Sequence, residues 1–589
     1  MPDAPWARVL REYALLADGE RGALLGPHGE IVWMCAPRWD SDAVFTSLLG
    51  GDGNYVVTPV DPTYVWGGYY EDDTLIWRTR WVTSEGAVEC REALALPADE
   101  HRLVLLRRID ATDRQANVRL VLNPRADFGR RKLRSLRRTD DRVWTGRTGD
   151  LHVRWTGAPR VRETDNGLET EVSVPSGEHL DLVLEVSDKP LPGELVDPDT
   201  AWEATATAWA DRVPNLGPTI GERDARHAYT VLSGLTSTSG GMVAAATSSL
   251  PERADAGRNY DYRFCWIRDQ CYAGRAVAAD GAHPLLDDAL RFVTERVLED
   301  GPGLKPAYTN RGGEVPSERQ LTHLIGYPGG GNTIGNKIDQ QFQLDAFGEA
   351  LLLLGAGARH DRLDSDHWNA VEVLVESIRK RGGEPDAGIW ELDDRRWAHS
   401  RLICASGLRA VAASAPANQA ASWASLADEL VASASEDCLH PSGRWQRAAD
   451  DERVDAALLL PAIRGGVAPD DPRSQATLDA VLSDLVQDDF VYRFRHDARP
   501  LEDAEGAFLL CGFFAALAMH QAGEPVTARA FYERSRAACG PPGLFSEEYD
   551  VRQRQLRGNL PQAFVHALML ETSVRLARPW SDEHHRPEE

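Results

Sequence analysis

Long uninterrupted apolar runs are missing from this 589-residue sequence. A membrane-spanning helix needs about 20 predominantly apolar residues, so none is predicted. The first ten residues also lack the basic stretch followed by an apolar stretch that marks a secretory leader. We therefore expect a soluble, cytoplasmic protein whose substrate is made in the cell or imported.

Closely spaced cysteines are also missing. The eight cysteines are scattered, without a Cys-x-x-Cys pair, which predicts neither a disulfide framework nor a zinc site. His323, His399 and His566 do not fall at metal-ligand spacing. We expect no metal and no other cofactor.

Positive charge is scarce relative to negative charge. The chain has 65 Lys and Arg against 91 Asp and Glu, a formal net charge of −26. This balance argues against nucleic acid and anionic membranes as partners. The composition is that of a globular protein and the length suffices for two or more domains. A homo-oligomer is compatible with the sequence.

The N-terminal third has an apolar period of two. Alternating segments such as 75–82, 103–109, 118–122 and 180–186 are separated by turn signals rich in Gly, Asn and Pro. Many strands with almost no helix predict an antiparallel β-sandwich over residues 1–197. Residues 198–221 are expected to be a helical linker.

From about residue 222 the apolar period becomes 3.6, and loops of alternating length separate the helical segments. Because the long loops recur before every second helix, they should gather at one end of a closed toroid of about six antiparallel helix pairs. This domain is predicted over 222–578, followed by a polar tail, 579–589. The predicted helices are 222–238, 267–279, 283–299, 337–357, 364–381, 397–413, 419–437, 452–464, 473–487, 505–522, 524–537 and 560–577.

The long loop before the second predicted helix carries an unusual mixture of side chains. Residues 259–270 contain Tyr262, Trp266, Arg268 and Asp269 among further aromatic and charged residues. Aromatic faces stack on the apolar side of a pyranose, and Arg and Asp make charge-assisted hydrogen bonds to its hydroxyls. The alternative is a core aromatic cluster with a buried ion pair.

Carboxylates recur on the other long loops. Glu391 follows Trp390, and Glu547 lies near aromatic residues and beside Glu548. A carboxyl against an aromatic wall loses hydration and can hold a proton, while a wetter carboxyl stays ionised. Glycoside hydrolysis needs such an acid and base. Taken singly, these residues could equally be helix-capping or surface charges, and the glycine-rich run 328–336 lacks the Gly-Lys-Ser/Thr of a phosphate loop.

In combination, four motifs resemble glycoside hydrolase family 15, the glucoamylase, glucodextranase and trehalase family. They are Tyr262-Arg-Phe-Cys-Trp-Ile-Arg-Asp269, Gly388-Ile-Trp-Glu391, Glu505-Gly-Ala-Phe-Leu-Leu-Cys, and Ser546-Glu-Glu-Tyr-Asp550 through Gly558-Asn-Leu-Pro-Gln-Ala-Phe564. The resemblance covers nearly the whole chain. It implies a β-sandwich followed by an (α/α)6 barrel, and inverting hydrolysis of a terminal α-glucosyl unit without a cofactor.

The resemblance also implies roles for individual residues. Glu391 would be the general acid and Glu547 the general base. Around the sugar it implies Tyr262, Trp266, Arg268 and Asp269, with Arg493 and Glu505 as further contacts. Tyr327, Trp390 and Glu548 are also expected to contact the sugar, because they lie on the same long loops. The loop 326–336 departs from the family pattern because its arginines are absent, so the leaving-group side is expected to differ.

We therefore predict an exo-acting, inverting α-glucoside hydrolase of the glucoamylase type, with a small carbohydrate as substrate. α,α-Trehalase is the alternative within the class, since trehalose is an intracellular disaccharide. A non-catalytic carbohydrate-binding relative would be expected to have lost Glu391 or Glu547, and both are present. A solenoid of helical repeats is disfavoured because no fixed repeat of about 30–45 residues appears.

Overall fold

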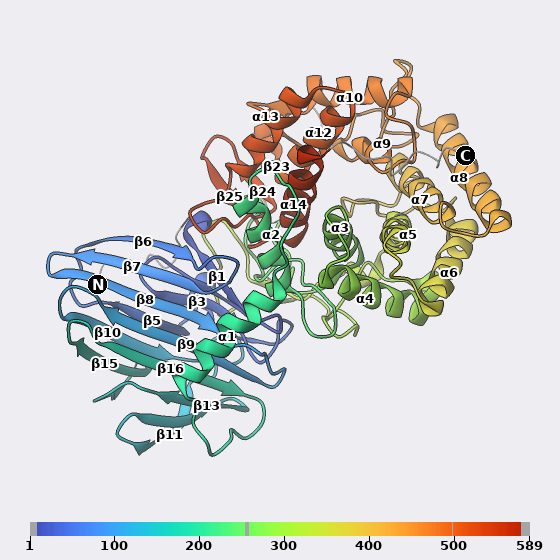
Figure 1. Ribbon diagram of the computed structural model, residues 1–589. Helices are drawn as coiled ribbons and strands as arrows, with labels where there is room; N and C mark the ends of the chain where they lie inside the picture. The colour runs from blue at the N-terminus through green and yellow to red at the C-terminus, as the bar shows by residue number, and fades with distance from the viewer. Residues whose placement is uncertain (1–8, 166, 254–257, 497–498, 579–589) are drawn as a thin grey trace.

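The computed structural model describes residues 9–165, 167–253, 258–496 and 499–578. The expected polar tail, 579–589, lies outside them. A layered β-region occupies one side of the molecule and a ring of helices the other (Figure 1). None of the helices in the described ranges is long and apolar enough to cross a membrane.

Two eight-stranded antiparallel sheets form the β-region, as the alternating pattern predicts. Inward-facing apolar residues of both sheets, among them Tyr55, Trp81, Leu105, Leu120 and Trp155, share one core. The first sheet contains β1 (Ala14–Ala17), β2 (Gly22–Leu25), β3 (Glu30–Cys35), β4 (Ala43–Phe45), β5 (Asn54–Pro59), β10 (Ala116–Asn123), β14 (Arg162–Thr164) and β15 (Gly167–Val174). The second contains β6 (Tyr64–Tyr70), β7 (Trp77–Thr83), β8 (Gly86–Leu94), β9 (Arg102–Ala111), β11 (Leu133–Asp140), β12 (Val143–Thr148), β13 (Leu151–Thr156) and β16 (His179–Ser187).

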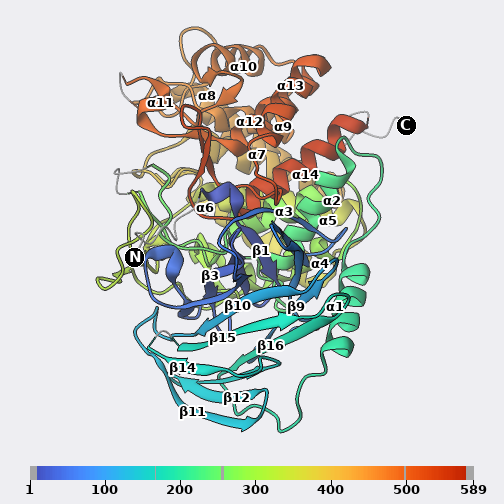
Figure 2. The same ribbon diagram turned by 90° about the vertical axis from the view of Figure 1, so that its left-hand side faces the viewer.

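Helix α1 (Pro198–Arg212) follows the sandwich and lies along it (Figure 2). Its N-cap, Asp197, accepts a hydrogen bond from the Thr200 amide. Trp202 is buried under the guanidinium of Arg91, 4.2 Å from its ring centroid. The segment expected as a linker is therefore packed against the sandwich.

Twelve helices build the ring in the described part of the chain, one for each predicted segment. The inner ones are α3 (Ile267–Ala278), α5 (Leu344–Arg359), α7 (Ala398–Ala412), the short α9 (Leu460–Ile463), α12 (Leu509–Gln521) and α14 (Ala563–Ala577). Each inner helix packs on the next, and α14 packs on α3, which closes the ring. The outer ones are α2 (Glu222–Leu235), α4 (Pro284–Asp300), α6 (Ser365–Arg381), α8 (Ala417–Asp437), α10 (Pro472–Asp484) and α13 (Pro525–Arg536). The predicted (α/α)6 architecture is thus confirmed.

Burial distinguishes the two rings. Almost every residue of α12 is buried, whereas α8 buries only a stripe of residues three or four apart and turns the rest to solvent. Inner helices also approach closely: a Cβ on Gly348 of α5 would lie 2.6 Å from the Cys404 amide nitrogen of α7. Glycine is required there because no side chain fits.

Three predicted inner helices begin at least four residues later than expected. The segment 337–357 becomes an α-helix only at Leu344, 452–464 only at Leu460 and 505–522 only at Leu509. In the last case β23 (Ala507–Phe508) pairs with β24 (Glu548–Asp550). Backbone groups committed to this small sheet cannot start the helix, and the pairing brings the loops before α12 and α14 together.

The sandwich and the ring meet beside the mouth of the barrel. The hairpin of β19 (Arg319–Gln320) and β20 (Thr333–Ile334) reaches the sandwich, where the Gly326 amide donates to Leu49 O at 3.0 Å. The buried Arg263 donates to Ser41 O at 2.8 Å and pairs with Asp261, which accepts from the Gly335 amide at 2.8 Å. One buried ion pair thus joins the sandwich, the loop before α3 and the loop before α5.

Candidate active site

A cavity of about 290 Å³ opens at the end of the ring where the inner helices begin. Asp269, Glu391 and Glu547 all line it, although they come from the first turn of α3 and from two separate loops. The loop alternation in the sequence predicts this convergence. Further lining residues are Glu252, Arg258, Tyr260, Tyr262, Trp266, Arg268, Tyr272, Glu318, Asn336, Lys337, Gln341, Trp390, Arg493, Phe508 and Gln562.

Glu391 is held by the first turn of α3. Trp266 is the N-cap of that helix, and its indole Nε1 donates to Glu391 Oε1 at 2.8 Å. Arg268 Nη2 donates to the same oxygen at 3.2 Å. Glu391 itself has φ +55°, a left-handed conformation that costs energy for a residue with a side chain. Backbone strain of this kind is common at functional sites, where it holds a side chain in a required position.

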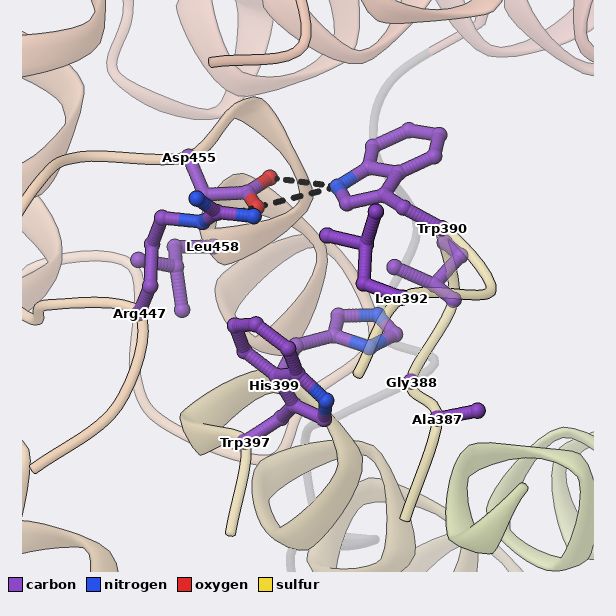
Figure 3. Close-up of a pocket in the computed structure, with 10 residues that line it drawn as sticks. Ala387, Gly388, Trp390, Leu392, Trp397, His399, Arg447, Asp455 and Leu458 are labelled. Atoms are coloured by element: carbon purple, nitrogen blue, oxygen red, sulfur yellow. Dashed lines mark hydrogen bonds and ion pairs between the residues drawn. The ribbon is translucent and has the colours of Figure 1, made fainter. Parts of the chain in front are cut away.

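Trp390 lies on the other side of this turn. Its indole Nε1 donates to both carboxylate oxygens of Asp455, at 2.9 and 3.0 Å (Figure 3). Asp455 is also paired with Arg447 at 3.2 Å. Trp390 therefore fixes the back of the turn and presents its ring to the cavity. Sequence reasoning gave no sign of Asp455 or Arg447, which lie about 60 residues downstream.

The small pocket drawn in Figure 3 lies directly behind this turn. His399 lines it, and neither ring nitrogen has a hydrogen-bond partner among the described residues. Burial, and then the nearby Arg268, lowers the pKa of His399 to about 3. His399 is therefore uncharged near neutral pH and packs in this pocket as a neutral ring.

Glu547 is the drier of the two carboxyls. It is buried, and the Tyr262 hydroxyl lies 3.3 and 3.4 Å from its two oxygens. Burial, followed by the neighbouring Glu252 and Glu548, raises the pKa of Glu547 well above its ordinary value. The side chain of Glu391, in contrast, is 26% exposed and faces a cation. The prediction that Trp390 shields the carboxyl of Glu391 from water is therefore wrong, because the Trp390 indole packs toward Asp455 and donates its hydrogen bonds there.

Arg493 reaches the cavity, but Glu505 and Glu548 lie behind it and do not line it. Arg493 Nε donates to Glu505 Oε1 at 3.2 Å, and the Gly506 amide donates to Glu548 Oε2 at 2.8 Å. Burial opposes ionisation of Glu505, yet Arg493 and His496 lower its pKa overall. Glu505 thus holds Arg493 in position, and Glu548 supports the pairing of β23 with β24.

Asp269 is buried at the inner end of the cavity. Burial raises its pKa to about 7; Arg268 opposes the shift and Glu391 adds to it. Its Oδ1 and the Tyr272 hydroxyl have no hydrogen-bond partner in the described structure. Buried polar atoms without partners are costly, and sugar hydroxyls would satisfy them.

Tyr327 does not line the cavity, which corrects the expectation that it contacts the substrate. It is buried nearer to Arg557 and Glu12. The segment Leu324–Gly326 contacts the sandwich, and the glycine-rich part that follows packs against residues 249–251 and Asn259. Only Glu318 and Asn336–Lys337 of this loop reach the cavity. The Lys337 ammonium pairs with Glu318 at 2.6 Å on this rim.

A sandwich joined to an (α/α)6 barrel, with two carboxyls from opposite loops over a sugar-sized cavity, is the arrangement of a glycoside hydrolase. The family profile of the Glycosyl hydrolases family 15 matches residues 225–574. The chain therefore belongs to glycoside hydrolase family 15 and is an enzyme. A second profile, described as trehalase-like, N-terminal, matches residues 6–187.

Curated relatives match over almost the whole chain. A trehalase of Mycobacterium tuberculosis is 28% identical over 616 residues, which cover 97% of this chain and 90% of the relative. Trehalase 1 of Sulfolobus acidocaldarius is 27% identical over 584 residues, which cover 95% and 98%. Among solved structures, a bacterial glucoamylase complexed with acarbose superposes with a TM-score of 0.66 at 14% identity, over 97% of this chain and 94% of that one.

Proposed function

We propose that this enzyme is an α,α-trehalase that hydrolyses trehalose with inversion. The observation that carries the proposal is the convergence of Glu391 and Glu547 on one cavity from the loops before α7 and α14. Trehalases related to both the sandwich and the barrel favour trehalose over the glucoamylase-type substrates that the motifs alone suggest.

In the proposed reaction one glucose ring lies against Asp269 and Arg268. Glu391 gives its proton to the glycosidic oxygen while the bond to the anomeric carbon breaks. A water attacks that carbon from the opposite face, and Glu547 accepts the water's proton. Trp266 and Arg268 both donate hydrogen bonds to Glu391 and so orient this acid. The second ring would leave past Glu318 and Lys337.

The substrate and the stereochemistry can be read in one experiment. With trehalose, inversion produces one β-glucose from the attacked ring and one α-glucose from the leaving ring. Retention produces α-glucose only. We expect equal initial anomer signals in proton NMR spectra recorded before mutarotation, and a higher kcat/KM for trehalose than for maltose, isomaltose or maltotriose. An initial signal of α-glucose alone would refute inversion, and a preference for maltotriose would refute the substrate.

Replacing Asp269 by asparagine is expected to lower kcat/KM about 10- to 100-fold, because a charge-assisted hydrogen bond to the held ring is lost. The loss should be similar for every α-glucoside cleaved, since Asp269 lies at the inner end of the cavity. Asp366→Asn on the exposed face of α6 is the matched control and should change nothing. A loss confined to one linkage would place Asp269 on the leaving-group side instead.

A further inference from the structure

A second glutamate faces the proposed base. Glu252 is buried, and its Oε1 lies 3.1 Å from the Tyr262 hydroxyl, which is also shared with Glu547. The carboxyls of Glu252 and Glu547 therefore face the same hydroxyl, and Glu252 adds to the raised pKa of Glu547. Gly558 packs against both, since a Cβ there would lie 3.7 Å from Glu252 Cγ and 3.7 Å from Glu547 Oε2.

The two carboxyls of this pair are not equivalent. Arg258 Nε lies 3.2 Å from Glu252 Oε2, so Glu252 has a cation directly beside it. The other groups around the pair come from several elements. They are Tyr260 and Tyr262 on the same loop, Glu548 on β24, Arg493, His496 and Glu505 beside the start of α12, and Glu391 across the cavity.

This arrangement bears on the chemistry, because a general base must be ionised to accept a proton. Two carboxyls in contact cannot both ionise easily in a buried site, and one proton remains on the pair. Burial, followed by the neighbouring Glu252 and Glu548, raises the pKa of Glu547, so that proton resides on Glu547 until the pH rises. A base of raised affinity for protons is also a stronger base once it is ionised.

We propose that Glu252 is a positioning residue that controls the protonation of Glu547 and thereby sets the lower pH limit of the enzyme. The proposal rests on the proposed function, in which Glu547 is the base. Glu252 does not reach the reacting atoms in this role. It acts through its contact with Glu547 and through the shared Tyr262 hydroxyl.

The test is the pH dependence of kcat/KM for trehalose. Glu252→Gln removes the negative charge and leaves an amide that can donate to Glu547, so Glu547 ionises more easily. We expect the acid limb of the profile to move to lower pH by about one unit or more. We also expect a lower plateau rate, because the base is weaker.

Two further variants fix the interpretation. Glu252→Asp keeps the charge and should leave the limb close to that of the wild type. Asp550→Asn removes one negative charge from the loop of Glu547 without contacting the pair, and should not move the limb.

If the acid limb of the kcat/KM profile did not move in Glu252→Gln and only the plateau fell, the proposal would be overturned. Glu252 would then have a structural role. Loss of hydrolysis at every pH, equal to that of Glu547→Gln, would also overturn it, because Glu252 would then be the base. If the wild-type enzyme did not cleave trehalose at all, the proposed function would fail, a result distinct from both.

Discussion

Glu391→Gln is expected to reduce trehalose hydrolysis about 10²- to 10⁴-fold, the usual contribution of a general acid. The same variant should hydrolyse α-glucosyl fluoride at a rate much closer to that of the wild type, since fluoride departs with little need of a proton. Glutamine keeps the size of the side chain and can still accept the hydrogen bonds of Trp266 and Arg268. Initial rates on both substrates measure the effect.

Glu547→Gln provides the contrast. Water must be activated whichever group leaves, so both substrates should slow by a similar factor. The comparison matters because Glu547 is the more buried carboxyl and the one with the raised pKa, properties that also suit an acid. If Glu547→Gln spared the fluoride and Glu391→Gln did not, the two roles would be exchanged.

Glu571→Gln is expected to lower the free energy of unfolding by about 3–5 kcal/mol. Glu571 on α14 and Arg464 beside α9 form a bidentate ion pair with no solvent exposure of either side chain. Removing one partner leaves a buried cation facing an amide. Equilibrium urea unfolding, followed by tryptophan fluorescence, measures the loss.

The matched control is Glu533→Gln on the outer helix α13. Glu533 pairs with Arg529 and Arg536 at 2.8 and 2.7 Å, but its side chain is 36% exposed, so the change should be about 0–1 kcal/mol. An equal loss in both variants would show that burial does not determine the strength of these pairs.

The loss of unfolding free energy in Glu571→Gln also depends on pH, and the direction of this dependence follows from the pKa of Glu571. Burial raises the pKa of Glu571, but Arg464 and Arg575 outweigh it and depress the pKa overall. A depressed carboxyl pKa contributes stability above the ordinary glutamate value of about 4.3 and loses it as the pH falls. The difference between wild type and Glu571→Gln should therefore be full near pH 7 and shrink below about pH 4.

The fold could be predicted because local pattern and burial agree along most of the chain. One-sided burial produces the period of two in the sandwich and the period of 3.6 in the outer helices, and the alternation of loop lengths indicates which helices are inner ones. The predicted start of the helix is too early at Ala507–Phe508, because the backbone of these residues pairs with β24 in the small sheet. Pairing with a strand 40 residues away leaves no signal in the local sequence.

The site could be predicted only where the chemistry lies inside one motif. Trp266, Arg268 and Asp269 occupy one helical turn, so their convergence follows from adjacency. Glu252 and Asp455 lie close to residues that are distant in the sequence, and nothing in their own neighbourhood marks them. The position of Tyr327 on the loop before α5 predicts that it lines the cavity, but contact with the sandwich holds that part of the loop away.

The inner end of the cavity is closed. Past Asp269 and Tyr272, successive turns of the inner helices place Asp345, Glu349, Arg464 and Glu571 across the axis of the ring, all buried. For the proposed reaction this dead end dictates an order of departure: the outer glucose must leave before the inner one can follow. A long glucan could not thread through the ring, and could present only its terminal unit at each encounter.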